Sequence, residues 1–261
     1  MNISLEGKTA VIGGSTQGIG LAIAKEFAEA GATCILLARN ETSLKEVVSQ
    51  LATSHQQKHQ YRIADFSKTE EVRAAIESIV QSSPVHILVN NTGGPKPGPI
   101  TEATDSAFTD AFSQHIICNQ ILVKAVLPSM KSAAYGRIIN IVSTSVRIPI
   151  NNLGVSNTIR GATASWAKTL SNEVAQFGIT VNNILPGFTE TARLESMITG
   201  ISQNRGVSKE SVRDDLTAEI PARRFGNVEE QAAVAVFLAS PAASYVNGVS
   251  IPVDGGRTGS I

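Results

Sequence analysis

The chain has 261 residues, of which 42% are hydrophobic and 17% are charged. This length allows one large α/β domain with a sizeable core, or two small domains. Lysine plus arginine and aspartate plus glutamate each total 22, so the formal net charge is zero. No bulk positive field therefore attracts nucleic acid or an anionic membrane surface, and we expect the partner to be a small-molecule substrate.

The start of the chain has no long apolar run after a basic segment, and no apolar stretch is long enough to span a membrane. We therefore expect a cytoplasmic protein with no signal peptide and no membrane contact. Cys34 and Cys118 both lie in apolar segments, which favours buried, reduced thiols. The histidines lack the spacing of metal ligands, so no metal site is expected.

Short apolar runs alternate with amphipathic stretches along the chain. Seven of the runs are rich in β-branched residues and are bounded by turn residues, which predicts strands. The predicted strands cover residues 9–12, 33–38, 60–63, 85–90, 137–142, 180–185 and 249–253. Helical patterns lie between them, over residues 19–30, 42–52, 70–80, 107–131, 161–176 and 229–239.

The alternation of strands and helices predicts a parallel sheet with helices on both faces. Strands of such a sheet are buried on both sides, so continuous apolar runs are expected in place of strict alternation. We predict a single α/β domain over residues 1–261, with three layers and a doubly wound parallel sheet of about seven strands. Residues 190–227 are more polar and less periodic, and we interpret them as a helical substrate lid within this domain.

A glycine-rich turn follows the first predicted strand and opens the first predicted helix. Glycines let the backbone turn tightly and approach a pyrophosphate, and the helix N-terminus supplies free N–H groups and a positive dipole. The place of the turn between strand and helix predicts a dinucleotide site, although a merely structural turn is the alternative. The residues of the turn are Gly14, Ser15, Thr16, Gln17, Gly18, Ile19 and Gly20.

The residues after the second predicted strand bear on the choice of cofactor. An acid about 20 residues past the glycines is typical for binding the ribose 2′-hydroxyl, but the sequence has Arg39 there. Arg39 suits a 2′-phosphate and favours NADP(H) over NAD(H); a solvated arginine at a helix start is the alternative. Asp65, beside Phe66 after the third strand, is a candidate acceptor for the adenine amine. Asx-turn chemistry explains Asp65 almost as well.

Over nearly its whole length the chain resembles the short-chain dehydrogenase/reductase family. Several motifs carry the resemblance together and make it specific. They are Gly14-x3-Gly18-Ile19-Gly20, Asn90-Asn91-Thr92-Gly93, the segment from Gly136 to Ser143, the segment from Pro186 to Thr191, and Val253-Asp254-Gly255-Gly256.

The resemblance implies a seven-stranded Rossmann fold, NAD(P) binding, and a homotetramer or homodimer. Relatives that use NADP often carry a basic residue where this chain has Gln17, so the preference for NADP(H) depends mainly on Arg39. Beyond the glycine turn, the residues expected to bind the cofactor are Arg39, Asp65, Phe66, Asn91, Thr92, Gly93, Arg160, Pro186, Gly187, Thr189 and Thr191.

Family enzymes transfer a hydride between the nicotinamide and a carbonyl or alcohol. They use a Tyr as acid/base, a Lys that binds ribose and lowers the Tyr pKa, a Ser that hydrogen-bonds the substrate oxygen, and an Asn that supports a water relay. By the resemblance, Ser143 matches the Ser. Ser156 and Arg160 fall at the Tyr and Lys positions, and His115 falls at the Asn position.

These replacements leave three hypotheses. The first is an NADP(H)-dependent oxidoreductase with an atypical active site, in which His115 substitutes for the acid because an imidazole titrates near neutrality; a histidine packed between helices is the alternative. The second is an NADP(H)-binding pseudoenzyme, sensor or partner subunit without hydride transfer. The third is non-redox chemistry on the same fold, which no residue singles out. An arginine such as Arg160 also suits an anionic substrate.

Overall fold

The computed structural model describes residues 1–260. In this part of the chain seven strands form one sheet in the order β3-β2-β1-β4-β5-β6-β7, and every neighbouring pair is parallel. This order is that of a doubly wound Rossmann sheet, as predicted. The strands are β1 (Thr9–Gly13), β2 (Thr33–Ala38), β3 (Gln60–Ile63), β4 (Ile87–Asn90), β5 (Gly136–Ile141), β6 (Ile179–Pro186) and β7 (Ser250–Val253).

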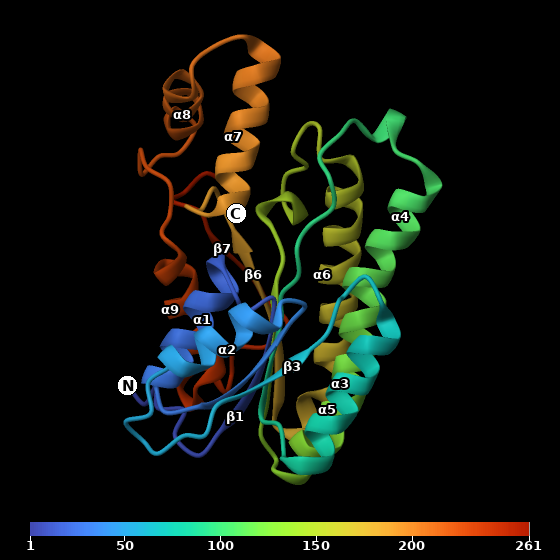
Figure 1. Cartoon of the computed structure of the whole chain (residues 1–261), viewed down its shortest axis with the longest axis vertical. Helices are drawn as coiled ribbons and strands as arrows, with labels where there is room; N and C mark the ends of the chain where they lie inside the picture. The colour runs from blue at the N-terminus through green and yellow to red at the C-terminus, as the bar shows by residue number, and fades with distance from the viewer. Residues whose placement is uncertain (261) are drawn as a thin grey trace.

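Helices cover both faces of the sheet, which makes three layers (Figure 1). One layer contains α1, α2 and α9, and the opposite layer contains α3, α5 and α6, whereas α7 and α8 project beyond one end of the sheet. The bounds of the helices are α1 (Gly18–Glu29), α2 (Glu41–Gln50), α3 (Thr69–Ser82), α4 (Asp105–Phe112), α5 (Cys118–Ser132), α6 (Gly154–Val174), α7 (Ala192–Arg205), α8 (Lys209–Ala218) and α9 (Val228–Ala239). None of them is both long and apolar enough to cross a membrane.

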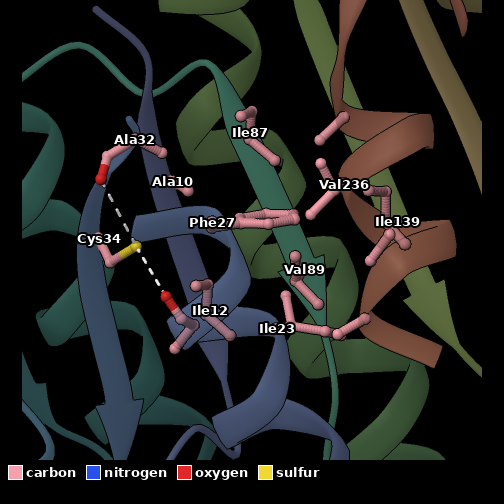
Figure 2. Packing of buried hydrophobic residues seen from close by; sticks show 14 of the residues in the cluster. Ala10, Ile12, Ile23, Phe27, Ala32, Cys34, Ile87, Val89, Ile139 and Val236 are labelled. Atoms are coloured by element: carbon pink, nitrogen blue, oxygen red, sulfur yellow. Dashed lines mark hydrogen bonds between the residues drawn. The ribbon is translucent and has the colours of Figure 1, made fainter. Parts of the chain in front are cut away.

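Two apolar cores, one on each face, hold the layers together. In the first, Phe27 of α1 is fully buried, and its ring points toward Val236 of α9 (Figure 2). Ile87 and Val89 of the central strand β4 lie on the same side. Cys34 is buried and unbridged in this core, as expected for a small apolar side chain. The continuous apolar runs of the sequence thus reflect strands that are covered on both faces.

The helical pattern over residues 107–131 predicts one continuous helix, and the structure is helical from Asp105 to Ser132 with a π-helical turn inside the run. α4 ends at Phe112, a π-helical turn covers Ser113–Ile117, and α5 begins at Cys118. A π turn inserts one extra residue into an otherwise α-helical run. The apolar periodicity on either side survives this insertion, so the sequence pattern did not reveal it.

α6 begins earlier than the predicted range of 161–176, at Gly154. Its first two turns are rich in β-branched, hydroxyl and amide residues, which have low helix propensity. Tertiary contacts stabilise this end instead: the Asn157 side chain donates a hydrogen bond to a backbone oxygen of the preceding loop at 2.8 Å. As a result, Ser156 and Arg160 lie inside a helix and one turn apart, on the same face.

A row of side-chain hydrogen bonds crosses four strands. It meets β4 at its last residue, β5 one residue before its end, β6 in its second half and β7 at its first residue. The Asn90 amide donates to Asn140 at 2.8 Å, the Asn140 amide donates to Asn183 at 2.8 Å, and the Asn183 amide donates to the Ser250 hydroxyl at 3.0 Å. These residues are direct neighbours in the strand register, and the three asparagines are buried. We call this row the asparagine ladder; it ties β4, β5, β6 and β7 together.

The middle of the ladder offers a test of its contribution to stability. Asn140→Ala leaves two buried polar groups without a partner, and each such group costs about 1–3 kcal/mol. We expect the free energy of unfolding to fall by about 2–5 kcal/mol in urea titrations. Ser250→Ala, which removes only the last bond of the ladder, is the control and should lose clearly less. Equal losses for the two variants would show that the ladder does not act as described.

Candidate functional site

The turn between β1 and α1 forms a tight backbone cradle. Gly14 and Gly18 have φ values of +56° and +55°, a left-handed conformation that favours glycine. A side chain at Gly20 would place its Cβ 2.2 Å from the Gly14 carbonyl oxygen, so only glycine fits there. The Asn91 amide donates to the carbonyls of Gly13 at 3.2 Å and Gly14 at 3.3 Å, which fixes the turn against the loop after β4.

The start of α1 is free to bind an anion. Its N-cap residue, Gln17, provides no side-chain hydrogen bond, so the first N–H groups of the helix are available to a ligand. Thr191 faces them across the cleft, because a Cβ placed on Gly18 would lie 3.4 Å from its methyl carbon. The Ser15 hydroxyl, in contrast, is buried and donates to the Leu37 carbonyl at 3.4 Å. The backbone of this turn therefore fits a pyrophosphate, and the Ser15 side chain supports the turn from within.

Two groups lie beyond the cradle, where the second and third strands end. Arg39 is exposed and makes no ion pair or hydrogen bond within residues 1–260. The Asp65 carboxylate accepts hydrogen bonds from the Ser67 backbone at 2.9 Å and hydroxyl at 2.8 Å. These bonds, with a smaller contribution from the nearby Arg39 charge, lower the pKa of Asp65. Phe66 is buried against Gly13, so it forms the wall behind the turn.

A cleft of about 620 Å³ extends from the cradle toward the ends of β4, β5 and β6. It brings Ser143, Ser156 and Arg160 together, as the sequence predicts, although His115 is absent from its described lining. Among residues 1–260, no Asp, Glu, His, Tyr or Cys side chain lines it. The predicted cofactor residues on its wall are Ile19, Asn91, Thr92, Gly93, Arg160, Pro186, Gly187, Thr189 and Thr191.

Arg160 is a buried cation at the base of this cleft. Only 9% of the residue is exposed, and its Nη1 donates to the Ile141 carbonyl at 2.8 Å. It forms no ion pair with a described carboxylate. Burial, and to a smaller degree the positive charge of Arg193, lowers the pKa of Arg160 to about 10. The guanidinium therefore remains charged at neutral pH and attracts electron-rich oxygens in the cleft.

His115 lies in the π-helical turn, behind the cleft wall. Its Nδ1 is 2.9 Å from the Thr92 hydroxyl, which does line the cleft, and its Nε2 is buried with no partner in the described part of the chain. Burial, followed by the positive charges of Arg160 and Arg193, lowers the pKa of His115 to about 3. The imidazole is therefore neutral in the physiological range.

The sequence pattern missed two arginines and an aromatic ring in this region. Arg193, in the first turn of α7, donates to the carbonyls of Gly94 at 3.0 Å and Pro95 at 3.3 Å, and so connects α7 to the loop after β4. Arg257, near the C-terminus, stacks on the Phe188 ring at 4.4 Å. All three lie in or beside motifs of the sequence: Phe188 is inside the segment from Pro186 to Thr191, Arg193 is two residues past it, and Arg257 directly follows Gly256.

Comparisons with known proteins show which family this chain belongs to. The family model described as enoyl-(acyl carrier protein) reductase matches residues 14–258. The NADPH-dependent reductase BacG of Bacillus subtilis is 30% identical over 256 residues, which is 97% of this chain and 99% of BacG. The chain belongs to the short-chain dehydrogenase/reductase family of oxidoreductases.

Further members of the family are similar over the same length. The 3-oxoacyl-(acyl-carrier-protein) reductase FabG of Pseudomonas aeruginosa is 33% identical over 258 residues, which is 97% of this chain and 98% of FabG. The solved structure of L-sorbose reductase from Gluconobacter frateurii, complexed with NADPH and L-sorbose, has a TM-score of 0.94 and 32% identity, with 100% of both chains covered. The glycine cradle of this chain is thus part of a complete dehydrogenase fold.

The low pKa of His115 has a measurable consequence for stability. The folded state keeps His115 neutral down to a pKa of about 3, whereas the unfolded state protonates it near pH 6.5. As pH falls from 6.5 toward 3, the unfolded state binds the extra proton, and stability decreases by about 1.4 kcal/mol per pH unit from this group.

Urea unfolding of His115→Gln between pH 4 and 7 tests this expectation. The variant should show a stability profile that falls less steeply on the acid side than that of the wild type. His55→Gln, which changes an exposed histidine, is the matched control and should keep the wild-type slope. Parallel profiles for His115→Gln and the wild type would contradict the assignment.

Proposed function

We propose that this protein is an NADP(H)-dependent oxidoreductase that acts on a carbonyl or alcohol substrate with an atypical active site. One observation carries the proposal: a single cleft extends from Ile19, at the end of the glycine turn, to Ser143, Ser156 and Arg160. NADPH is named for the relatives BacG and L-sorbose reductase, which supports the same cofactor here.

The residues of this chain fit a dinucleotide along the whole cleft. The N-terminus of α1 and the glycine turn would hold the pyrophosphate, and Thr191 would close over it from the lid side. Arg39 would pair with the 2′-phosphate, since it is exposed and has no partner in the described chain. Arg160 would donate to ribose hydroxyls, as the family Lys does. When bound, the reduced nicotinamide supplies a hydride to the carbonyl carbon.

Ser143 and Ser156 would bind and polarise the substrate carbonyl. Both serines line the cleft, and each hydroxyl can donate one hydrogen bond to the carbonyl oxygen. Arg160, one helical turn from Ser156, adds a fixed positive charge that stabilises the negative charge developing on that oxygen. A guanidinium does not give up its proton at neutral pH, so Arg160 orients and stabilises without acting as the acid.

Proton delivery to the oxygen of the product alcohol is then the slow step of the reaction. A serine hydroxyl is a much weaker acid than the tyrosine typical of the family, so water in the cleft must supply the proton through the hydroxyl groups. Loss of a positioned general acid typically costs about 10²- to 10⁴-fold in rate. We therefore propose slow turnover relative to Tyr-Lys members of the family.

The sequence predicts His115 as a substitute acid, and its surroundings favour a less direct role. A neutral imidazole with a pKa of about 3 has almost no protonated form to donate at pH 7. Its link to the cleft is the hydrogen bond to the Thr92 hydroxyl. In this proposal, His115 holds Thr92 in place beside the substrate and does not itself deliver the proton.

Binding of NADP(H) without hydride transfer is the second candidate. The observation that favours it is the lack of an acidic side chain near neutral pH in the described lining of the cleft. Turnover separates the two candidates. NADPH oxidation with a panel of aldehydes, ketones and quinones would support the oxidoreductase, whereas tight NADPH binding with no consumption across the panel would support the second candidate.

The preference for NADPH can be tested at Arg39. Arg39→Ala removes a charged donor to the 2′-phosphate, and hydrogen bonds to charged groups are worth about 1.5–3 kcal/mol. We expect the Kd for NADPH to rise about 10- to 100-fold, with the Kd for NADH unchanged, in calorimetric titrations. Arg73→Ala, which removes an exposed arginine paired with Glu70, is the control. Equal weakening of both cofactors, or none, would rule out the phosphate role.

Steady-state kinetics tests the roles of the serines and of Arg160. Ser143→Ala should lower kcat for the best carbonyl substrate about 10- to 100-fold, because it removes one of two donors to the reacting oxygen. The double variant Ser156→Tyr with Arg160→Lys restores the acid and its supporting cation, and we expect kcat to rise.

The affinity of each variant for NADPH is the control, because Ser143→Ala should bind NADPH about as tightly as the wild type does. If Ser143→Ala turns over like the wild type, the proposed polarisation of the carbonyl is wrong. If the wild type is inactive and the double variant is active, the natural chain is a binding protein that lacks only its acid.

A further inference from the structure

The cofactor cleft opens into a second cavity of about 880 Å³, which lies beneath the lid. The two share lining residues, including Thr144, Phe188 and Arg257. The second cavity is therefore the space next to the reacting carbonyl, and its lining decides which substrate body fits. Most of this lining is apolar, with side chains such as Ile150 and Met197.

The charges that line these two cavities are mostly positive. Lys96, Arg160, Arg193 and Arg257 lie on their walls, and Glu219 is the one carboxylate among the described lining residues. Buried or partly buried cations need negative or polar partners, because desolvation of an unpaired charge is costly. Three of these cations line only the cofactor cleft, whereas Arg257 also lines the second cavity, where it is paired with Glu219. Recognition of an anionic group in the second cavity therefore depends on how much of Arg257 is left free by that pair.

Two of the arginines already have other partners. Arg160 donates to the Ile141 carbonyl and lies one turn from Ser156, at the reacting centre. Arg193 donates hydrogen bonds to the carbonyls of Gly94 and Pro95. The phosphates of a dinucleotide would lie at the glycine cradle, at the other end of the cleft. Neither set of contacts uses Arg257.

The Arg257 guanidinium is held on one edge by Glu219, and its other edge has no protein partner within residues 1–260. The carboxylate of Glu219 accepts from its Nε at 3.3 Å and its Nη2 at 2.8 Å through a single oxygen. The guanidinium plane lies over the Phe188 ring at 4.4 Å. Its Nη1 has no hydrogen-bond partner within residues 1–260, and the side chain is 21% exposed. The edge formed by Nη1 and Nη2 can thus take a carboxylate end-on, with two parallel hydrogen bonds.

We propose that Arg257 is the substrate-recognition residue of this cleft, and that the substrate is a keto acid with an apolar body. Its carboxylate binds the free edge of Arg257, its apolar body fills the cavity beneath the lid, and its carbonyl lies between Ser143 and Ser156. This inference depends on the proposed function, because it names the substrate class of the same cleft.

Matched pairs of acids and esters test the inference. Phenylglyoxylate, benzoylpropionate and benzoylbutyrate differ in the separation of carbonyl and carboxylate, and each has a neutral methyl ester that is more apolar. We expect at least one acid to bind the NADP⁺-saturated protein about 10- to 100-fold more tightly than its ester by calorimetry. In an apolar cavity without a carboxylate site, the ester would bind more tightly.

Variants assign that preference to Arg257. Arg257→Gln should bring the affinities for acid and ester to within about threefold, and Arg257→Lys, which keeps the charge without the planar fork, should retain part of the preference. Arg205→Gln, which removes a lid arginine paired with Asp215 outside both cavities, should behave as the wild type. The ratio of acid to ester is insensitive to a general loss of folded protein.

Three results would overturn the proposal: equal binding of acids and esters, a preference that persists in Arg257→Gln, or no binding of any acid at millimolar concentration. Parallel assays of NADPH consumption separate this failure from failure of the proposed function. Reduction of the esters but not the acids would overturn the carboxylate site and leave the oxidoreductase standing. Arg257-dependent binding of the acids without any turnover would do the reverse.

Discussion

The two hydrogen bonds from the Asn91 amide to the carbonyls of Gly13 and Gly14 are the constraint on which the site depends. β1 and β4 are neighbours in the sheet although they are far apart in the sequence, and the chain reverses direction of winding between them. In a doubly wound sheet, the crevice at this reversal is where ligands bind. By fixing the β1–α1 turn to the loop after β4, Asn91 sets the width of that crevice. The left-handed glycines then bring the backbone close enough to receive phosphate oxygens.

The asparagine ladder extends the same control to the rest of the cleft. Asn90 directly precedes Asn91, Asn140 lies just before the loop with Ser143, and Asn183 lies before the loop with Gly187. A flexible sheet would let these loops drift relative to one another, and a drift of about 1 Å is enough to cost a large part of catalysis. The buried side-chain bonds fix the relative register of β4, β5 and β6 within a few residues of the loops that follow these strands, so the loops start from defined positions.

The fold was accessible from the sequence because strands covered on both faces leave continuous apolar runs, and because the glycine turn marks the boundary between β1 and α1. The start of α6 was not, since the helix there depends on contacts such as that of Asn157 and not on propensity. The π-helical turn around His115 preserves the local pattern of the helices it separates, so no periodicity reveals it. Arg257 was missed for another reason: only the folded chain brings the C-terminal segment against Phe188. Sequence spacing carries information about local structure and about motifs, but not about convergence of distant segments.

The family resemblance assigns Ser156 to the position of the family tyrosine and Arg160 to that of the family lysine, and in our proposal the two changes act together on the electrostatics of the cleft. A lysine beside a tyrosine lowers the tyrosine pKa and so prepares an acid for neutral pH. Beside a serine this benefit disappears, because no available shift brings an aliphatic hydroxyl into that range. What remains useful is a cation that is permanently charged, planar and capable of several directed hydrogen bonds. Arg160 meets that description. Burial lowers the pKa of His115, and the Arg160 charge adds to this effect. In the proposed mechanism, the charge that would stabilise an oxyanion therefore adds to burial in disfavouring an imidazolium acid behind Thr92.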